Sequence, residues 1–177
     1  MDCVIWEERT VEMVKKGKIV KEREDIKVCF AASSGGHFEQ LSMLRPMMET
    51  YDIFIITEET DYNALKSSME KVYYMRQVNR KEHMVLFCMM INFFRSCRIF
   101  HKEKPDVVVC TGVLAMIPIC LIAKLMRKKL IYIESFAKVT TPTETGRLMY
   151  RIADQFYVQW ESMLEVYPNA IYLGGIY

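Results

Sequence analysis

The chain has little excess charge of either sign. Its 177 residues contain 24 lysines and arginines against 22 aspartates and glutamates, which leaves a net charge of +2 at pH 7. It also lacks a basic run with interleaved aromatic residues and any base-reading motif, the features that mark nucleic-acid binders. Nucleic acid is therefore a poor candidate for a partner.

Paired cysteines and metal-binding patterns are missing as well. The six cysteines include no C-x-x-C spacing, and most fall in apolar segments, where a thiol acts as a small hydrophobe. The three histidines, His37, His83 and His101, show no ligand spacing with cysteines or carboxylates, so we expect no metal site. A reducing, cytoplasmic setting fits this composition.

Long apolar runs are absent. Residues 1–25 are crowded with charges and contain no signal-peptide core, and Met84–Phe94 is apolar except for Asn92 but falls short of the ~20 residues of a spanning helix. There is no repeat, low-complexity tract or Gly/Ser linker. We expect one domain over residues 26–177, preceded by a charged arm or peripheral helix over residues 1–25.

Short apolar strands alternate with helical segments along this domain. Strands are predicted over 26–31, 53–57, 72–75, 107–111, 130–134, 155–158 and 170–173. Helices are predicted after residue 37 with a break at Pro46, over 83–102, 113–126 and 144–153, and from about Trp160. This alternation predicts an α/β fold with a Rossmann-like parallel sheet flanked by helices.

The first strand runs into a small-residue turn, Ser33-Ser34-Gly35-Gly36-His37. A glycine-rich turn between a strand and a helix lets backbone N–H groups approach an anion such as phosphate, and histidine adds a group that titrates near neutral pH. The motif matches neither the P-loop nor the three-glycine dinucleotide pattern. Tight turning alone, with a capping or surface histidine, is the alternative interpretation.

Two further strand ends are predicted at the same edge of the sheet, where ligands of parallel α/β folds gather. They are Thr111-Gly112 and Glu134-Ser135. Gly112 either permits close approach of a ligand or merely ends a strand. Glu134 either has a direct functional role at this edge, or serves as a helix cap or salt-bridge partner.

The segment from residue 84 presents apolar side chains followed by basic ones, a pattern suited to an anionic bilayer surface. A core helix with a solvated basic end is the alternative. The residues predicted to contact a membrane are Leu86, Phe87, Met90, Phe93, Phe94, Arg95 and Arg98.

Taken together, these motifs resemble the acceptor-side subunit of two-subunit glycosyltransferases. The resemblance covers residues 26–177 and rests on residues 33–37, 106–112, 133–137 and 152–160. The family includes PssD-like exopolysaccharide and capsule proteins, the membrane-anchoring subunit of the dolichol-diphosphate N-acetylglucosaminyltransferase and, distantly, MurG. It implies the N-terminal half of a GT-B glycosyltransferase.

The resemblance implies a division of labour between two chains. This chain would bind a polyprenyl-diphosphate-linked sugar acceptor through Ser33, Ser34, Gly35, Gly36, Thr111, Gly112 and Ser135, with His37 or Glu134 as the catalytic base. No cofactor is implied, because the UDP-sugar is a substrate held mainly by a small donor-binding subunit.

The same resemblance implies a heterodimer at the cytoplasmic face of a bacterial-type plasma membrane, peripherally attached and engaged in polysaccharide biosynthesis. Aromatic residues near a chain end suit an interface, so the predicted partner surface is Trp160, Gly174, Gly175, Ile176 and Tyr177. The chain would be inactive alone.

Two other functions remain open at this point. A self-sufficient sugar-nucleotide-dependent glycosyltransferase acting as a homodimer would bind UDP-sugar without a partner. A purely structural membrane adaptor would not need the Gly-Gly-His turn.

Overall fold

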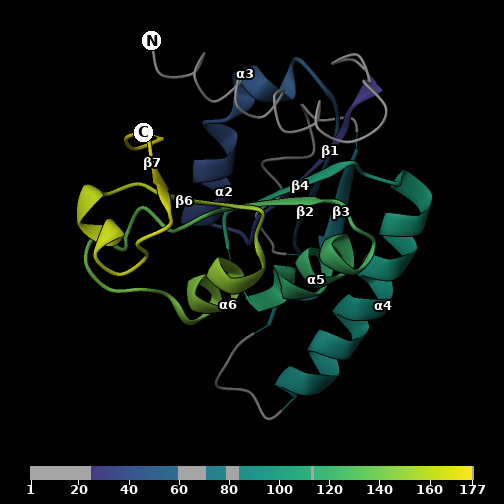
Figure 1. Cartoon of the computed structure of the whole chain (residues 1–177). Helices are drawn as coiled ribbons and strands as arrows, with labels where there is room; N and C mark the ends of the chain where they lie inside the picture. Colours follow the sequence, from purple (N-terminus) through teal and green to yellow (C-terminus); the bar gives the residue numbers. More distant parts are fainter. Residues whose placement is uncertain (1–24, 60–70, 79–83, 113, 177) are drawn as a thin grey trace.

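The structure is a computed structural model that describes residues 25–59, 71–78, 84–112 and 114–176 (Figure 1). The predicted arm over residues 1–25 lies outside the described residues, apart from Asp25.

Seven strands form one sheet in which every neighbouring pair is parallel. The strand order is β3-β2-β1-β4-β5-β6-β7, which confirms the predicted Rossmann-like sheet. The strands are β1 (Lys27–Ala31), β2 (Asp52–Glu58), β3 (Val72–Met75), β4 (Val107–Cys110), β5 (Lys129–Ile133), β6 (Gln155–Val158) and β7 (Ile171–Tyr172).

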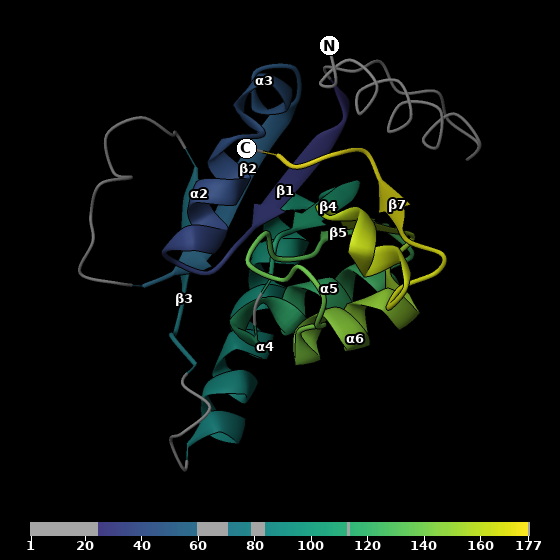
Figure 2. The same ribbon diagram turned by 90° about the vertical axis from the view of Figure 1, so that its left-hand side faces the viewer.

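Helices cover both faces of the sheet (Figures 1 and 2). One face carries α2 (Gly36–Ser42) and α3 (Arg45–Met48), and the other carries α4 (Val85–Glu103), α5 (Ile117–Leu125) and α6 (Glu144–Ile152). Pro46 lies in the first turn of α3, where a missing N–H costs nothing. The predicted break after α2 is therefore confirmed.

Two predicted helices are shorter than expected. Within the span 113–126, the 3-10 turn η2 (Leu114–Met116) precedes α5, because Pro118 lies in the first turn of α5 and fixes where that helix begins. The element near Trp160 is only a 3-10 turn, η3 (Glu161–Leu164).

The core lies in two layers, one on each side of the sheet. Phe38 and Leu41 of α2 pack with Val109 of β4 in one cluster, whereas Val108 of the same strand packs with Ile119 of α5 in the other. Alternate residues of a strand point to opposite faces, so a strand between two helical layers is apolar throughout. This explains the uninterrupted run of valines in β4.

An ion-pair cluster ties α4 to the amino ends of the strands. Glu103 accepts hydrogen bonds from Lys27 Nζ at 3.0 Å and from Tyr73 Oη at 2.5 Å, and Lys71 Nζ lies 3.7 Å away. Burial by itself would raise the pKa of Glu103, but these hydrogen bonds and cations outweigh it, and its pKa is lowered. Glu103 is therefore charged in the folded protein at neutral pH.

A second polar contact holds α4 against the end of β3. Asn92 is fully buried, and its amide accepts from Arg76 N at 2.9 Å and donates to Arg76 O at 2.8 Å. Both hydrogen-bonding groups of the Arg76 backbone are thus satisfied by one side chain. The single polar residue of the apolar run 84–94 has a structural role.

Candidate functional site

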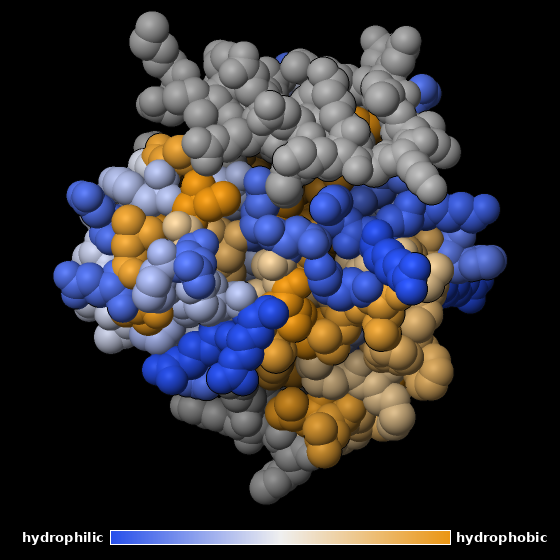
Figure 3. Space-filling model, viewed as in Figure 1, coloured by the Kyte–Doolittle hydropathy of each residue, from blue (hydrophilic) through white to orange (hydrophobic). Residues whose placement is uncertain are grey.

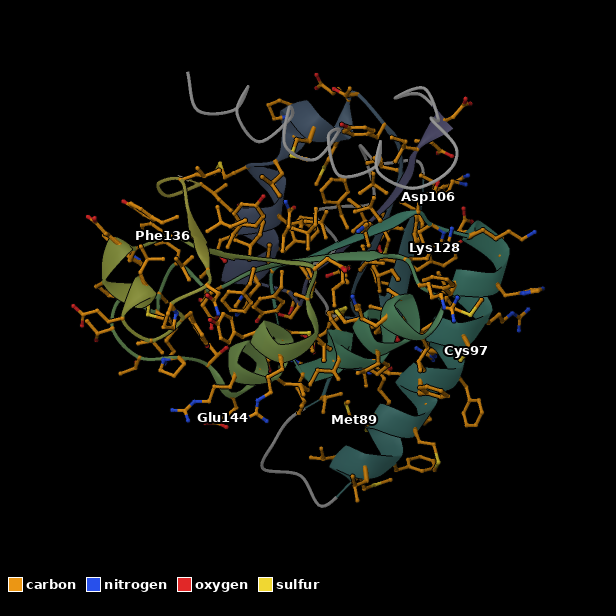
Figure 4. All side chains as sticks on the ribbon, in the orientation of Figure 1. Met89, Cys97, Asp106, Lys128, Phe136 and Glu144 are labelled. Carbon is orange, nitrogen blue, oxygen red and sulfur yellow. The ribbon has the colours of Figure 1, made fainter. Side chains whose placement is uncertain are left out.

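The predicted site segments lie at the ends of adjacent strands. Because β1, β4 and β5 are neighbours and parallel, the residues that follow them emerge at the same edge of the sheet. Thr111 Oγ1 donates to His37 O at 2.9 Å and joins the first two segments directly. Asp106 and Lys128 directly precede β4 and β5, whereas Phe136 follows β5. Figure 4 shows the first two residues and Phe136 on opposite sides of the molecule.

The turn after β1 has an open outer side. Gly35 has a φ of 75°, in the left-handed region that favours glycine, and its carbonyl accepts from Phe38 N and Glu39 N. Gly35 and Gly36 are exposed, and a Cβ atom on either would meet no atom within 4 Å. Ser33 is buried and Ser34 is half-buried, so the two glycines are the accessible part of the turn.

His37 is half-buried against Gly112. A Cβ atom at Gly112 would lie 3.1 Å from His37 Cε1 and 3.2 Å from Nδ1, and Gly112 has a φ of 107°. Nδ1 itself is buried and has no hydrogen-bond partner within the described part of the chain. Glycine at position 112 is required both by the backbone and by the imidazole ring beside it.

Glu134 points inward and is only 1% exposed. Its carboxylate accepts hydrogen bonds from Ser135 N at 2.9 Å, from Thr143 Oγ1 at 3.0 Å and from Tyr167 Oη at 3.0 Å. Thr143 is in turn the N-cap of α6 and accepts from Gly146 N at 2.7 Å. This arrangement favours the structural alternative for Glu134, an anchor for the start of α6.

Close packing reinforces that anchor. A Cβ atom at Gly146 would lie 1.8 Å from Glu134 Oε2, so the carboxylate occupies the space that any other side chain would need. Burial, followed by the nearby negative charge of Glu134, raises the pKa of Tyr132 and of Tyr167. Both phenols remain protonated at neutral pH, and the Tyr167 hydroxyl donates to Glu134.

Glu58 is a residue at this edge that was not predicted. It ends β2, is 7% exposed, and accepts from Ser34 Oγ and from Val78 N, each at 3.4 Å. The strand-end argument applied to Thr111 and Glu134 also covers Glu58, because it directly follows the apolar run 53–57. Its side chain connects the turn after β1 to the chain beyond β3.

The predicted partner surface gathers beside the β5 turn. Trp160 Nε1 donates to Phe136 O at 2.6 Å, and the two rings lie 4.9 Å apart. Ile176 packs against the apolar cluster that contains α2, and Gly175 is exposed. Figure 2 shows this carboxyl-terminal segment running from β7 toward α2 and α3. Tyr177 lies outside the described residues.

All seven residues predicted to contact a membrane are exposed on α4. Leu86 and Phe94 are the most exposed of its apolar side chains, at 84% and 66%. Exposed apolar residues of α5 and its C-cap, Leu121, Leu125 and Met126, were not predicted. Figure 3 shows apolar side chains gathered over the lower part of the molecule, where α4 and α5 lie.

Two negative findings concern the described residues only. None of their helices combines the length and apolarity needed to traverse a bilayer. No three histidine, cysteine, aspartate or glutamate side chains among them gather where they would hold a metal ion.

Comparison with known structures identifies the fold. MurG of Acinetobacter baumannii matches with a TM-score of 0.65 and 18% identity over 77% of this chain and 42% of MurG. A UDP-N-acetylglucosamine 2-epimerase matches with a TM-score of 0.64 and 12% identity over 84% of this chain and 46% of the epimerase. The chain therefore spans less than half of these proteins and has the fold expected of a GT-B N-terminal half.

Sequence comparison identifies the family. The UDP-N-acetylglucosamine transferase subunit ALG14 of Homo sapiens is 29% identical over an alignment 192 positions long, which covers 93% of this chain and 89% of the human protein. The subunit of the same name from Yarrowia lipolytica is 28% identical over 93% of this chain and 74% of its own length. Residues 9–176 match the family described as "Oligosaccharide biosynthesis protein Alg14 like". This chain belongs to that Alg14-like family.

Proposed function

We propose that the chain is a non-autonomous subunit of a UDP-N-acetylglucosamine transferase. In this role it binds a polyprenyl-diphosphate-linked acceptor and recruits a small donor-binding subunit to the membrane. The observation that carries the proposal is the family match over residues 9–176, together with relatives that are named as subunits of this transferase.

The site offers part of the chemistry that sugar transfer needs. The acceptor hydroxyl must lose a proton or be polarised, and the donor must be oriented toward it. His37 suits the first task, because its half-buried ring directly follows the open turn. In this proposal His37 is the base or hydrogen-bond donor, and Glu134 positions the segment around it.

The acceptor side is assigned to residues 33–36, Thr111, Gly112 and Ser135. Gly35 and Gly36 are accessible, whereas Thr111 is buried and supports the His37 backbone. In this proposal the glycines and Ser135 contact the acceptor, and Thr111 and Ser33 maintain the shape of the turn.

The pathway we propose is synthesis of a lipid-linked oligosaccharide with N-acetylglucosamine as the transferred sugar. The relatives that support it are eukaryotic, and they give no support to the expected capsule or exopolysaccharide pathway or to a bacterial-type membrane. The exposed apolar side chains of α4, with Arg95 and Arg98 beside them, are the proposed contact with an anionic membrane surface.

Co-expression tests this function. The chain is produced with and without a candidate small glycosyltransferase subunit from the same genome, and both preparations receive UDP-N-acetylglucosamine and a polyprenyl-diphosphate-linked N-acetylglucosamine acceptor. We expect co-purification and transfer only with both chains, and loss of transfer in His37→Ala. Transfer by this chain alone would establish the homodimeric enzyme instead, and full activity of His37→Ala pairs would establish the adaptor.

A further inference from the structure

One buried glutamine joins the turn after β5 to the carboxyl-terminal segment. Gln159 directly follows β6 and is 4% exposed. Its Nε2 donates to Glu134 O at 2.8 Å, and its Oε1 accepts from Ile176 N at 3.1 Å. Because both ends of the amide are used, its orientation is fixed by two segments that are distant in sequence.

Phe136, in the turn after β5, makes a second set of contacts with the same two regions of the chain. Phe136 O accepts the indole N–H of Trp160, and a Cβ atom at Gly175 would lie 3.2 Å from Phe136 Cε2. Phe136 therefore packs against both the residue after Gln159 and the carboxyl-terminal segment. Figure 4 shows Phe136 on the same side of the molecule as β7.

The end of β5 also lies near His37. Glu134 holds Ser135 N and the N-cap of α6, and the neighbouring Tyr132 places its hydroxyl 3.6 Å from a Cβ atom at Gly112. The same Cβ position lies 3.2 Å from His37 Nδ1. Tyr132 interacts with Glu134 and Thr143, so packed, buried side chains connect the surroundings of Glu134 with those of His37.

We propose that Gln159 is a positioning residue that couples residues 174–176, part of the surface predicted to contact the partner subunit, to the turn at Glu134–Phe136. Docking of the partner then fixes the acceptor side of the site through this one amide. The inference rests on the proposed function and adds to it a reason why activity depends on assembly.

The kinetic test compares two glutamines of the same strand region. Gln159→Met removes both hydrogen bonds at nearly constant volume. Gln155→Met is the matched control, because Gln155 is also buried and lies at the opposite, amino end of β6. With the assembled pair, we expect Gln159→Met to lower kcat about tenfold, as for the loss of one or two net hydrogen bonds, at unchanged KM for UDP-N-acetylglucosamine.

Gln155→Met is expected to change kcat less than about twofold, since small effects are typical away from such contacts. Equal losses of kcat in the two variants would overturn the inference. So would a lower Tm of the Gln159→Met protein with kcat unchanged below that Tm.

A fluorescence test needs neither partner nor activity. The chain has two tryptophans, so Trp6→Phe leaves Trp160, in contact with Phe136, as the only tryptophan excited at about 295 nm. Ile176→Pro removes the N–H that Gln159 accepts. We expect Ile176→Pro to shift the Trp160 emission in the Gln159 protein and to add nothing in the Gln159→Met protein.

Additive shifts would overturn the coupling. If the wild-type pair shows no transfer, the proposed function fails, and the emission test alone still decides whether Gln159 couples the two segments.

Discussion

His37 and Glu134, the two side chains predicted as alternative bases, differ in what surrounds them. The carboxylate of Glu134 is buried and accepts hydrogen bonds from Ser135, Thr143 and Tyr167, whereas His37 Nδ1 meets no such partner among the described residues. A saturated acceptor holds its neighbours in place, whereas the buried Nδ1 leaves its hydrogen-bonding capacity unused within the described residues. These different surroundings support the proposed roles, in which Glu134 is a positioning residue and His37 is the base or hydrogen-bond donor.

Gly112→Ala tests the packing around His37. The added methyl group would crowd the imidazole ring at 3.1 Å, and the φ of 107° disfavours alanine, so we expect a stability loss of about 1–3 kcal/mol. We also expect a displaced His37 ring, seen as shifted imidazole proton signals in NMR spectra. Unshifted signals would contradict the close contact.

Gly174→Ala is the control for backbone strain. Gly174 has a comparable φ of 95°, but a Cβ atom there would meet nothing within 4 Å. We expect a similar loss of stability from this variant and His37 signals at their wild-type positions.

The ion pair between Lys27 and Glu103 makes stability depend on pH. The pKa of Glu103 is lowered from its ordinary value of 4.5, so its contribution is fully present above about pH 4.5 and is lost as the pH falls through the lowered pKa. We expect Glu103→Gln to lower the free energy of unfolding by about 1–3 kcal/mol at pH 7. The difference from the wild type should shrink below pH 4 in urea titrations, and a constant difference would show that the charge is irrelevant.

At the scale of elements, α6 is held at its start by a carboxylate from the sheet. Its N-cap Thr143 binds Glu134, and Gly146 leaves room for that carboxylate. A cap usually serves one helix, but here the strand end, the cap and the first turn of the helix share a single buried group. The position of α6 relative to β5 is therefore fixed by polar contacts as well as by apolar packing.

Gly146→Ala tests this junction. Alanine favours helix by about 1 kcal/mol over glycine, yet its Cβ would lie 1.8 Å from Glu134 Oε2. We expect a net loss of about 1–3 kcal/mol, measured by urea unfolding. Gly36→Ala, where nothing lies within 4 Å, should be neutral or slightly stabilising, and equal effects of the two variants would refute the clash.

Helices and strands could be predicted where the local pattern of apolar residues and prolines determines them. Continuous apolar runs such as Val107–Val109 predicted strands buried on both faces, and Pro46 predicted the break between α2 and α3. The orientation of Glu134 was not predictable, because its partners Thr143 and Tyr167 lie 9 and 33 residues further along the chain. Non-local contacts of that kind leave no local pattern.

On the scale of the whole molecule, the main asymmetry is an apolar surface on the α4 and α5 side (Figure 3). The sequence predicted its α4 part. The α5 part depends on how two helices pack side by side, which the separate sequences of those helices do not specify. Exposed apolar patches of this kind mark interaction surfaces.

A matched pair of methionines tests whether this surface binds membranes. Met90 on α4 is 52% exposed and Met43 beside α2, on the other face of the sheet, is 47% exposed. We expect Met90→Glu to reduce sedimentation with anionic phosphatidylglycerol vesicles several-fold, because a charge is costly at an apolar interface. Met43→Glu should bind as the wild type does. Equal binding of all three proteins would assign the surface to a protein partner.

The strand order has a consequence for where new specificity can arise. The chain builds outward from β1 to β3, then returns to β4 and builds outward to β7. The segments that follow β1 and β4 leave toward opposite faces, to α2 and to α5 (Figure 1), and they meet at the seam between these strands, where His37 contacts Thr111 and Gly112. Under the proposed function, we expect sequence changes that suit a different acceptor sugar at exposed residues beside this seam, whereas Gly112 and Glu134 are fixed by the packing around them.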